Sequence, residues 1–360
     1  MAFRVYADPH YTTALRTSLV ALPEKFQSKI TTPPSFPWTR IMDYLDITGI
    51  LALRRLNRET KHQADRYMDQ VFTYERPLKQ YFSLEETRLF RYIHEATGVL
   101  ASGIPALSFL SRRPIDRTVL KLFVVNRHAG TLISFLQQIG FVCVRYTWRQ
   151  CTANYKPLLN AVQRSTFLDT IDLKEAYPDL SVEARIHFAR EDSGIDVYVC
   201  PRSPVQAILQ GACTCDTVFF TASEAYCLFP QTLLSKGTNY ILRVSSKSQR
   251  WFGNALGAYD VEEWPRFDYV HPLVTTSSDF QPFPRFLGDN SCYILRFSGG
   301  MRNLDEGWSG FHANQFAIIH STTPEGCVLS LSSVATLSQC MSFYTTPNHL
   351  LEPAHQADSL

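Results

Sequence analysis

The sequence lacks any apolar run of about 18 residues, the length that a membrane-spanning helix requires. The segment up to Phe26 also lacks the continuous apolar stretch and the small-residue cleavage site of a secretory signal. An excess of charge of one sign is also absent, since 35 basic and 33 acidic residues leave a formal net charge of only +2. We therefore expect no membrane partner. The balance also argues against nucleic acid as a partner, because the strong basic field that dominates such binding is missing.

A regular cysteine framework is absent as well. The nine cysteines are an odd number scattered between Cys143 and Cys340, which favours reduced thiols over disulfides and predicts a cytoplasmic or nuclear protein. Cys213, Cys215 and Cys227 do not have the paired spacing of structural zinc ligands. We predict that they are buried free thiols, and that the protein uses neither a metal nor another cofactor.

Apolar and aromatic residues are what the sequence does contain. Hydrophobic residues make up 45% of the chain and aromatic residues 13%, which excludes general disorder and supports large cores. A length of 360 residues is sufficient for two or three such cores.

The pattern along the chain predicts an α+β fold in four parts. We expect a helical module over 12–80, an α/β core over 84–245 and a β-containing C-terminal region over 246–344. The remainder, 345–360, is predicted to be a flexible tail.

Local signals predict individual elements of the core. Ser83 and Glu86 form a capping-box pattern, so a helix is expected from about 84 to 97, where Gly98 ends it. An apolar strand is expected over 119–125. The segments 182–190 and 195–200 are predicted to form a hairpin.

Two segments carry a resemblance to a known family. Residues 101–125, with the motifs GIPAL and LKLFV, and residues 195–237, with the motif AYCLFP, resemble the nucleotidyltransferase-like core of uncharacterised proteins from mushroom-forming fungi. The resemblance implies a mixed sheet with flanking helices. In an active core of this kind, a Gly-Ser turn holds a triphosphate on backbone N–H groups, and three carboxylates on strands hold Mg²⁺.

Most of these active-site residues are replaced in this chain. Gly103 keeps the turn, but Ile104 stands where the family has serine. Val119 and Lys121 stand where it has two aspartates, and only Asp196 could supply the third carboxylate. Because hard metal ions need anionic oxygen ligands, we predict that the chain is not an enzyme. These five residues are the expected lining of a degenerate ligand pocket.

Two alternatives remain open at this pocket. Asp116 could replace a missing carboxylate in a shifted register, although an acid in a surface loop is the simpler interpretation. Lys121 could hold a phosphate without metal, or it could pair with Asp196 or extend from a strand edge toward water. We favour the second role for Lys121.

The N-terminal segments 22–30 and 42–60 resemble an F-box, a helical module that docks on the adaptor subunit of a cullin-type ubiquitin ligase. The residues that the resemblance assigns to this partner are Leu22, Pro23, Ile41, Leu45, Ile50, Leu51 and Leu53. They could anchor the module in a groove of the adaptor, or they could face the core of this protein.

The expected function follows from these resemblances. It is that of a non-catalytic interaction or adaptor protein that recruits a target to a cullin-type ubiquitin ligase through its N-terminal helices. The alternative is a degenerate nucleotidyltransferase-like module that binds a nucleotide or a phosphorylated ligand without turnover.

Overall fold

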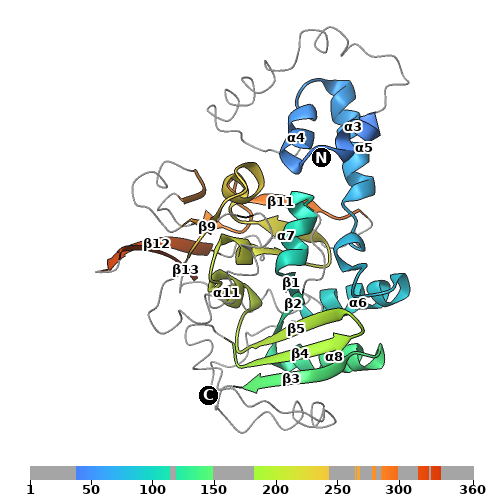
Figure 1. Cartoon of the computed structure of the whole chain (residues 1–360), viewed down its shortest axis with the longest axis vertical. Coiled ribbons are helices and arrows are strands. Elements are labelled where there is room, and N and C mark those ends of the chain that lie inside the picture. The colour runs from blue at the N-terminus through green and yellow to red at the C-terminus, as the bar shows by residue number, and fades with distance from the viewer. Residues whose placement is uncertain are drawn as a thin grey trace, which may run out of the picture. The chain divides into compact units, whose positions relative to one another are not determined.

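The computed structural model describes nine stretches of the chain (Figure 1). They are residues 38–113, 119–148, 182–242, 264, 266–267, 278–280, 285–298, 315–323 and 326–333. The chain forms two compact units whose boundary lies between Val71 and Phe72, which precedes the predicted end of the helical module at residue 80.

The described part of the first unit, residues 38–71, contains three helices. They are α3 (Trp38–Asp43), α4 (Ile47–Leu53) and α5 (Arg58–Val71). Side-chain caps separate them: Asp46 Oδ1 accepts a hydrogen bond from Gly49 N at 2.7 Å, and Asn57 Oδ1 accepts one from Thr60 N at 2.9 Å. These caps explain why 42–60 contains parts of several helices, although its apolar spacing resembles that of one.

The second unit is built on a mixed sheet of eight strands. In spatial order they are β11 (Tyr293–Arg296), β7 (Glu224–Cys227), β6 (Val218–Phe220), β1 (Leu100–Ser102), β2 (Val119–Val125), β5 (Ser193–Cys200), β4 (Ala184–Arg190) and β3 (Val142–Trp148). Strands β2 and β5 are parallel, and the other neighbours are antiparallel. The α+β class is thereby confirmed, and β11 of the C-terminal region belongs to the same sheet as the core.

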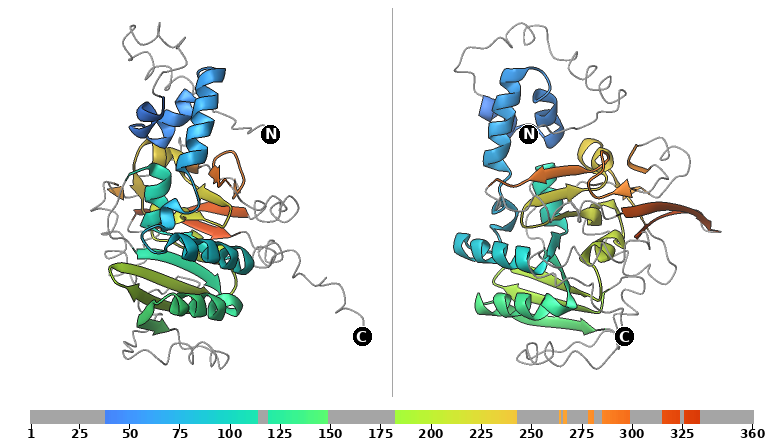
Figure 2. Two further views of the ribbon diagram at one scale, coloured as in Figure 1. Left: turned by 90° about the vertical axis from the view of Figure 1, so that its right-hand side faces the viewer. Right: turned by 180° about the vertical axis from the view of Figure 1, so that it is seen from behind.

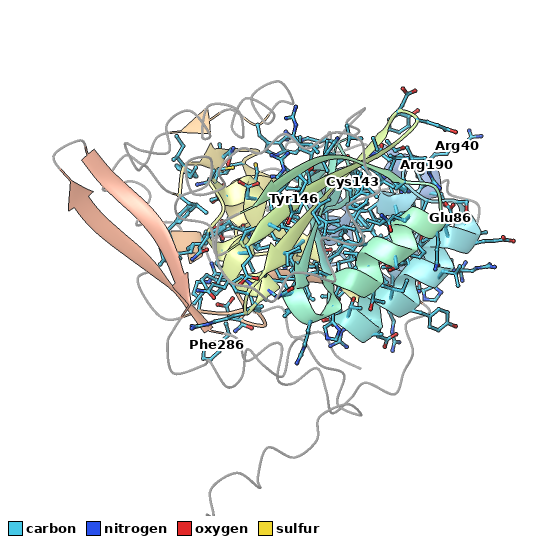
Figure 3. The ribbon with its side chains drawn as sticks, turned by 90° about the horizontal axis from the view of Figure 1, so that it is seen from below. Arg40, Glu86, Cys143, Tyr146, Arg190 and Phe286 are labelled. Atoms are coloured by element: carbon cyan, nitrogen blue, oxygen red, sulfur yellow. The ribbon has the colours of Figure 1, made fainter. Side chains whose placement is uncertain are left out.

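Helices α6 (Leu84–Thr97) and α8 (Asn126–Gln138) lie side by side on one face of this sheet (Figure 2). Arg190 of β4 donates to the Glu86 carboxylate of α6 and to the carbonyl of Ile139 just after α8 (Figure 3). Side chains alternate between the two faces along a strand, so Phe188 faces these helices too. The predicted capping box on Ser83 is present, and Gly98 ends α6 at φ 62°.

The opposite face carries α7 (Ile104–Ser111), α11 (Pro204–Leu209) and the 3₁₀ turn η3 (Thr214–Thr217). Lys121 of β2 reaches η3 through an ion pair to Asp216, which places both on this face. The predicted hairpin is confirmed, because β4 and β5 pair from Ala184↔Val199 to Arg190↔Ser193.

Smaller elements complete the described part of the unit. They are η1 (Arg76–Leu78), η4 (Gln231–Ser235), η5 (Ser278–Phe280), β8 (Asn239–Tyr240), β9 (Arg266–Phe267), β10 (Arg285–Phe286), β12 (Gln315–Thr323) and β13 (Gly326–Ser333). Strands β10, β12 and β13 form a separate antiparallel sheet. No described helix is both long and apolar enough to cross a membrane.

Candidate functional site

A row of polar side chains crosses five neighbouring strands on the face opposite α6 and α8. Ser102 of β1 lies opposite Lys121 of β2, and Lys121 lies opposite Asp196 of β5. The row continues to His187 of β4 and Arg145 of β3. Directly opposed residues on neighbouring strands point to the same face, so the sheet register gathers these five side chains. We call them the polar row.

Asp196 is the buried centre of this row, with 4% of its side chain exposed. Arg185 Nη2 donates to Asp196 Oδ2 at 2.7 Å, and His187 Nδ1 lies 2.7 Å from Asp196 Oδ1. Burial alone would raise the pKa of Asp196. The hydrogen bond with His187 and the charge of Arg185 overcome that effect and hold the pKa below its ordinary value. Asp196 is therefore a carboxylate that orients two basic side chains.

Lys121 forms an ion pair with Asp216, which corrects our expectation that Asp196 or water would be its partner. The distance between Lys121 Nζ and Asp216 Oδ1 is 2.8 Å. The other oxygen of Asp216 accepts a hydrogen bond from Ala212 N at 3.0 Å. Burial disfavours the ammonium, but the Asp216 carboxylate raises the pKa of Lys121 above its ordinary value. Asp196 is already bound to Arg185, and the turn before η3 fixes Asp216 within reach of Lys121.

Gly103 forms the turn between β1 and α7 with φ 93°, a conformation that suits glycine. The stem of Lys121 packs directly against this turn, since a Cβ atom on Gly103 would lie 3.3 Å from Lys121 Cγ. Ile104 opens α7 and is half-buried, and the next residue is Pro105, which has no N–H to offer an anion. The Lys121 stem therefore fills the space beside the glycine turn.

The remaining pocket residue, Val119, is 38% exposed and lies opposite Gly194. It contributes no oxygen ligand. Asp116 lies outside the described residues. Among the residues that the structure describes, no three His, Cys, Asp or Glu side chains are grouped so that they could hold a metal ion.

The three cysteines singled out in the sequence are buried free thiols. Cys213, Cys215 and Cys227 each have 0% of their surface exposed. Burial raises the pKa of Cys215, and the neighbouring Cys213 raises it further. A thiol with a raised pKa is a poor nucleophile at neutral pH, so Cys215 is not a candidate catalytic residue. Complete burial places all three cysteines in the core.

The residues assigned to a ligase adaptor have varied surroundings. Leu22 and Pro23 lie outside the described residues, whereas Ile41 and Leu51 are half-buried. Ile50 is fully buried with Met42, Ala64 and Tyr67, and Leu45 and Leu53 pack against that cluster. At least three of the seven residues therefore help to form the core of their own helical unit.

The sequence did not indicate five residues of the site: Ser102, Arg145, Arg185, His187 and Asp216. Arg185 and His187 had a detectable signal, because alternate residues of a strand point to one face. Directly opposed residues of a hairpin point to the same face as each other. Placing the turn of the hairpin at 191–192 would have set His187 opposite Asp196. Asp216 gave no such signal, because its approach to Lys121 depends on the path of the chain after α11.

The comparisons identify no relative for this chain. No family model matches it, and neither a curated protein nor a solved structure does.

Proposed function

We propose that this protein is a non-catalytic binding protein whose polar row holds an anionic ligand of the phosphate type. In this proposal the core is a degenerate nucleotidyltransferase-like module that binds a nucleotide or another phosphorylated molecule without turnover. We prefer this function to that of a ligase adaptor because Leu45 and Leu53, two of the assigned docking residues, pack on the core of their own unit.

The observation that carries the proposal is the difference in exposure between acidic and basic side chains. The carboxylates of Asp196 and Asp216 are 4% and 9% exposed. The side chains of Lys121, His187 and Arg185 are 27%, 29% and 31% exposed. A ligand that approaches this face therefore meets basic side chains, while the acids lie beneath them. Arginine and lysine in such an arrangement favour phosphate oxygens.

Binding without turnover follows from the same contacts. Asp196 holds Arg185 and His187, and Asp216 holds Lys121. A carboxylate that already neutralises a cation is a poor ligand for Mg²⁺, which selects anionic oxygens. The site offers hydrogen bonds and positive charge to a phosphate, and its described residues do not form the metal cage that would activate a nucleophile.

Replacement of Arg185 by Gln tests this proposal. We expect it to weaken the binding of inorganic pyrophosphate about 10-fold or more, measured by isothermal titration calorimetry, because it removes a charge-assisted hydrogen bond. Arg127→Gln is the matched control, because Arg127 is an exposed arginine on α8 and should leave Kd unchanged. Equal Kd values for the wild type and both variants would place the bound anion elsewhere and would reject the site.

The adaptor role remains a second candidate because the helices of the first unit have a core of their own. Among the described residues of this unit, 38–71, the large apolar side chains of Tyr44 and Leu56 are 91% and 37% exposed. They are better candidates for anchors in a partner groove than the packed Leu45 and Leu53.

A binding assay with the purified adaptor subunit of a cullin-type ligase tests this second candidate. If the unit docks through these side chains, Tyr44→Ser should weaken binding about 10-fold without changing the circular dichroism spectrum. Tyr92→Ser on α6, which removes a tyrosine that is 63% exposed outside the unit, is the control. No binding by the wild-type chain would end the adaptor hypothesis.

A further inference from the structure

A second row of side chains runs beside the polar row on the same four strands. Val119 of β2 lies opposite Gly194 of β5, Gly194 opposite Ala189 of β4, and Ala189 opposite Val142 of β3. Each member stands two residues from a member of the polar row on β2, β5 and β4, so both rows share one face. We call this second set the apolar row, because it contains no polar side chain.

The apolar row is open to solvent. Val142 is 62% exposed and Val119 is 38% exposed, and Gly194 and Ala189 between them are half-buried. Valines on a strand normally pack against a partner, so their exposure at both ends of one row is a feature to be explained. Four neighbouring strands span three gaps of about 4.8 Å, so the row is about 14 Å long.

On the other side of the polar row, Phe123 and Tyr198 close the face over β2 and β5. Their rings stack with centroids 4.8 Å apart, and the two residues are 6% and 7% exposed. Arg185 lies opposite Tyr198 on β4 and stays 31% exposed. A ligand held at Arg185 and His187 can extend from there across the apolar row.

His187 joins the two rows at Gly194. A Cβ atom at this glycine would lie 3.3 Å from His187 Cε1 and 3.3 Å from Val119 Cγ2. The glycine therefore lets the imidazole and the valine approach each other across β5. A side chain of the proposed phosphate site, His187, thus lies directly beside the apolar surface of Val119.

The geometry points to a ligand with two chemically different parts: a phosphate monoester that carries a short hydrocarbon group. Its phosphate lies on Arg185, His187 and Lys121, and its hydrocarbon lies across Val119, Gly194 and Val142. This inference rests on the proposed function and specifies the ligand class of that site. Charge complementarity fixes one end of the ligand, and the exposed valines match the other end. A strip this short fits one small molecule better than a bilayer surface.

A series of phosphate esters tests the inference on the full-length chain. Titration calorimetry with inorganic phosphate, methyl phosphate, butyl phosphate and hexyl phosphate should give affinities that rise with chain length. We expect about a threefold gain per methylene that reaches the apolar row, in keeping with the free energy of burying a methylene. Affinity that is independent of chain length would overturn the inference.

Val142→Ser isolates the apolar row. Because Val142 is exposed, its replacement should preserve the fold, which circular dichroism would verify. It should reduce the gain from methyl to hexyl phosphate while leaving the affinity for inorganic phosphate unchanged. Leu89→Ser, at a residue of α6 that is 56% exposed, is the control and should leave both quantities unchanged. An unchanged gain in Val142→Ser would also overturn the inference.

The two proposals fail in different ways. If inorganic phosphate does not bind and Arg185→Gln has no effect on any ester, the proposed function is wrong. If inorganic phosphate binds and requires Arg185, but the esters show no chain-length dependence, only the apolar subsite is wrong. Binding to phosphatidic acid vesicles with no affinity for the soluble esters would assign the rows to a membrane surface and would overturn the inference as stated.

Discussion

Lowering the pH from 7.5 to 4.5 is expected to destabilise the wild-type protein by about 2.5 kcal/mol more than a His94→Gln variant. His94 lies on α6 with 1% of its surface exposed, and its Nδ1 lies 2.8 Å from the Tyr74 hydroxyl. The rings of Phe90 and Phe220 pack on it at 5.1 and 5.9 Å between centroids. Burial in this aromatic cluster lowers the pKa of His94 to about 3.

The direction of the effect follows from the depressed pKa. An unfolded chain binds a proton at this imidazole near its ordinary pKa of 6.5, whereas the folded chain does so only near 3. Between these values the unfolded state carries one more proton. Lowering the pH therefore stabilises the unfolded state and reduces the free energy of unfolding. The contribution of His94 is fully present above pH 6.5 and is lost progressively toward pH 3.

Urea unfolding followed by circular dichroism at both pH values measures this difference. Gln at position 94 keeps a hydrogen-bonding group beside Tyr74 but cannot titrate. The control is His62→Gln, which removes an exposed histidine on α5 by the same substitution. Equal acid sensitivity in the wild type and in His94→Gln would show that His94 is not the neutral, buried group described above.

Separation of Lys121 from Asp216 should produce the second large effect. Asp216→Asn keeps an acceptor for Ala212 N but removes the negative charge opposite Lys121 Nζ. We expect a loss of about 3 kcal/mol in the free energy of unfolding, because one member of a largely buried ion pair is left without its counter-charge. Lys121→Met should reduce the free energy of unfolding by a similar amount, because it leaves the Asp216 carboxylate without its counter-charge.

The double variant Asp216→Asn with Lys121→Met distinguishes pairing from packing. Its loss should be smaller than the sum of the two single losses by about 2 kcal/mol, because neither variant group is charged. Lys61→Met provides a scale, because its pair with Asp65 spans 3.9 Å at the surface and should contribute less than about 0.5 kcal/mol. Strictly additive losses in the double variant would mean that Lys121 and Asp216 do not stabilise each other.

Much of the core could be predicted because its signals are local. The capping box at Ser83 and Glu86 fixed the start of α6 within one residue, and Gly98 fixed its end. The apolar run VLKLFVV, interrupted only by Lys121, marked β2 as Val119–Val125, the range expected from the sequence. In each case the determining atoms lie within one turn of helix or along one strand.

The partner of Lys121 could not be predicted in the same way. The sheet register puts Lys121 opposite Asp196, and sequence reasoning stopped there. The actual partner is 95 residues away, in a turn whose position depends on how α11 packs. A similar limit applied in the first unit, where the sequence predicted a helical module but not the caps at Asp46 and Asn57 that divide it into separate helices. Capping competes with helix continuation, and the balance depends on packing.

The site combines residues that the sequence indicates with residues that only the fold brings together. The sequence indicates Gly103, Ile104, Val119, Lys121 and Asp196. Of these, Lys121 and Asp196 belong to the polar row, Val119 belongs to the apolar row, and Gly103 lies beside Lys121. Ile104 belongs to neither row, since it opens α7 beyond the turn. The donors that give the site its character, Arg185 and His187, come from the hairpin strand β4.

Calorimetric titration of the wild-type chain with inorganic pyrophosphate, first with EDTA and then with Mg²⁺, tests the central claim most directly. Phosphorus NMR of the ligand recovered after prolonged incubation completes the measurement. The account predicts saturable binding in EDTA, because Arg185 and Lys121 supply the positive charge, and it predicts recovery of intact pyrophosphate under both conditions. Binding that appears only with Mg²⁺, or release of inorganic phosphate when Mg²⁺ is present, would contradict it.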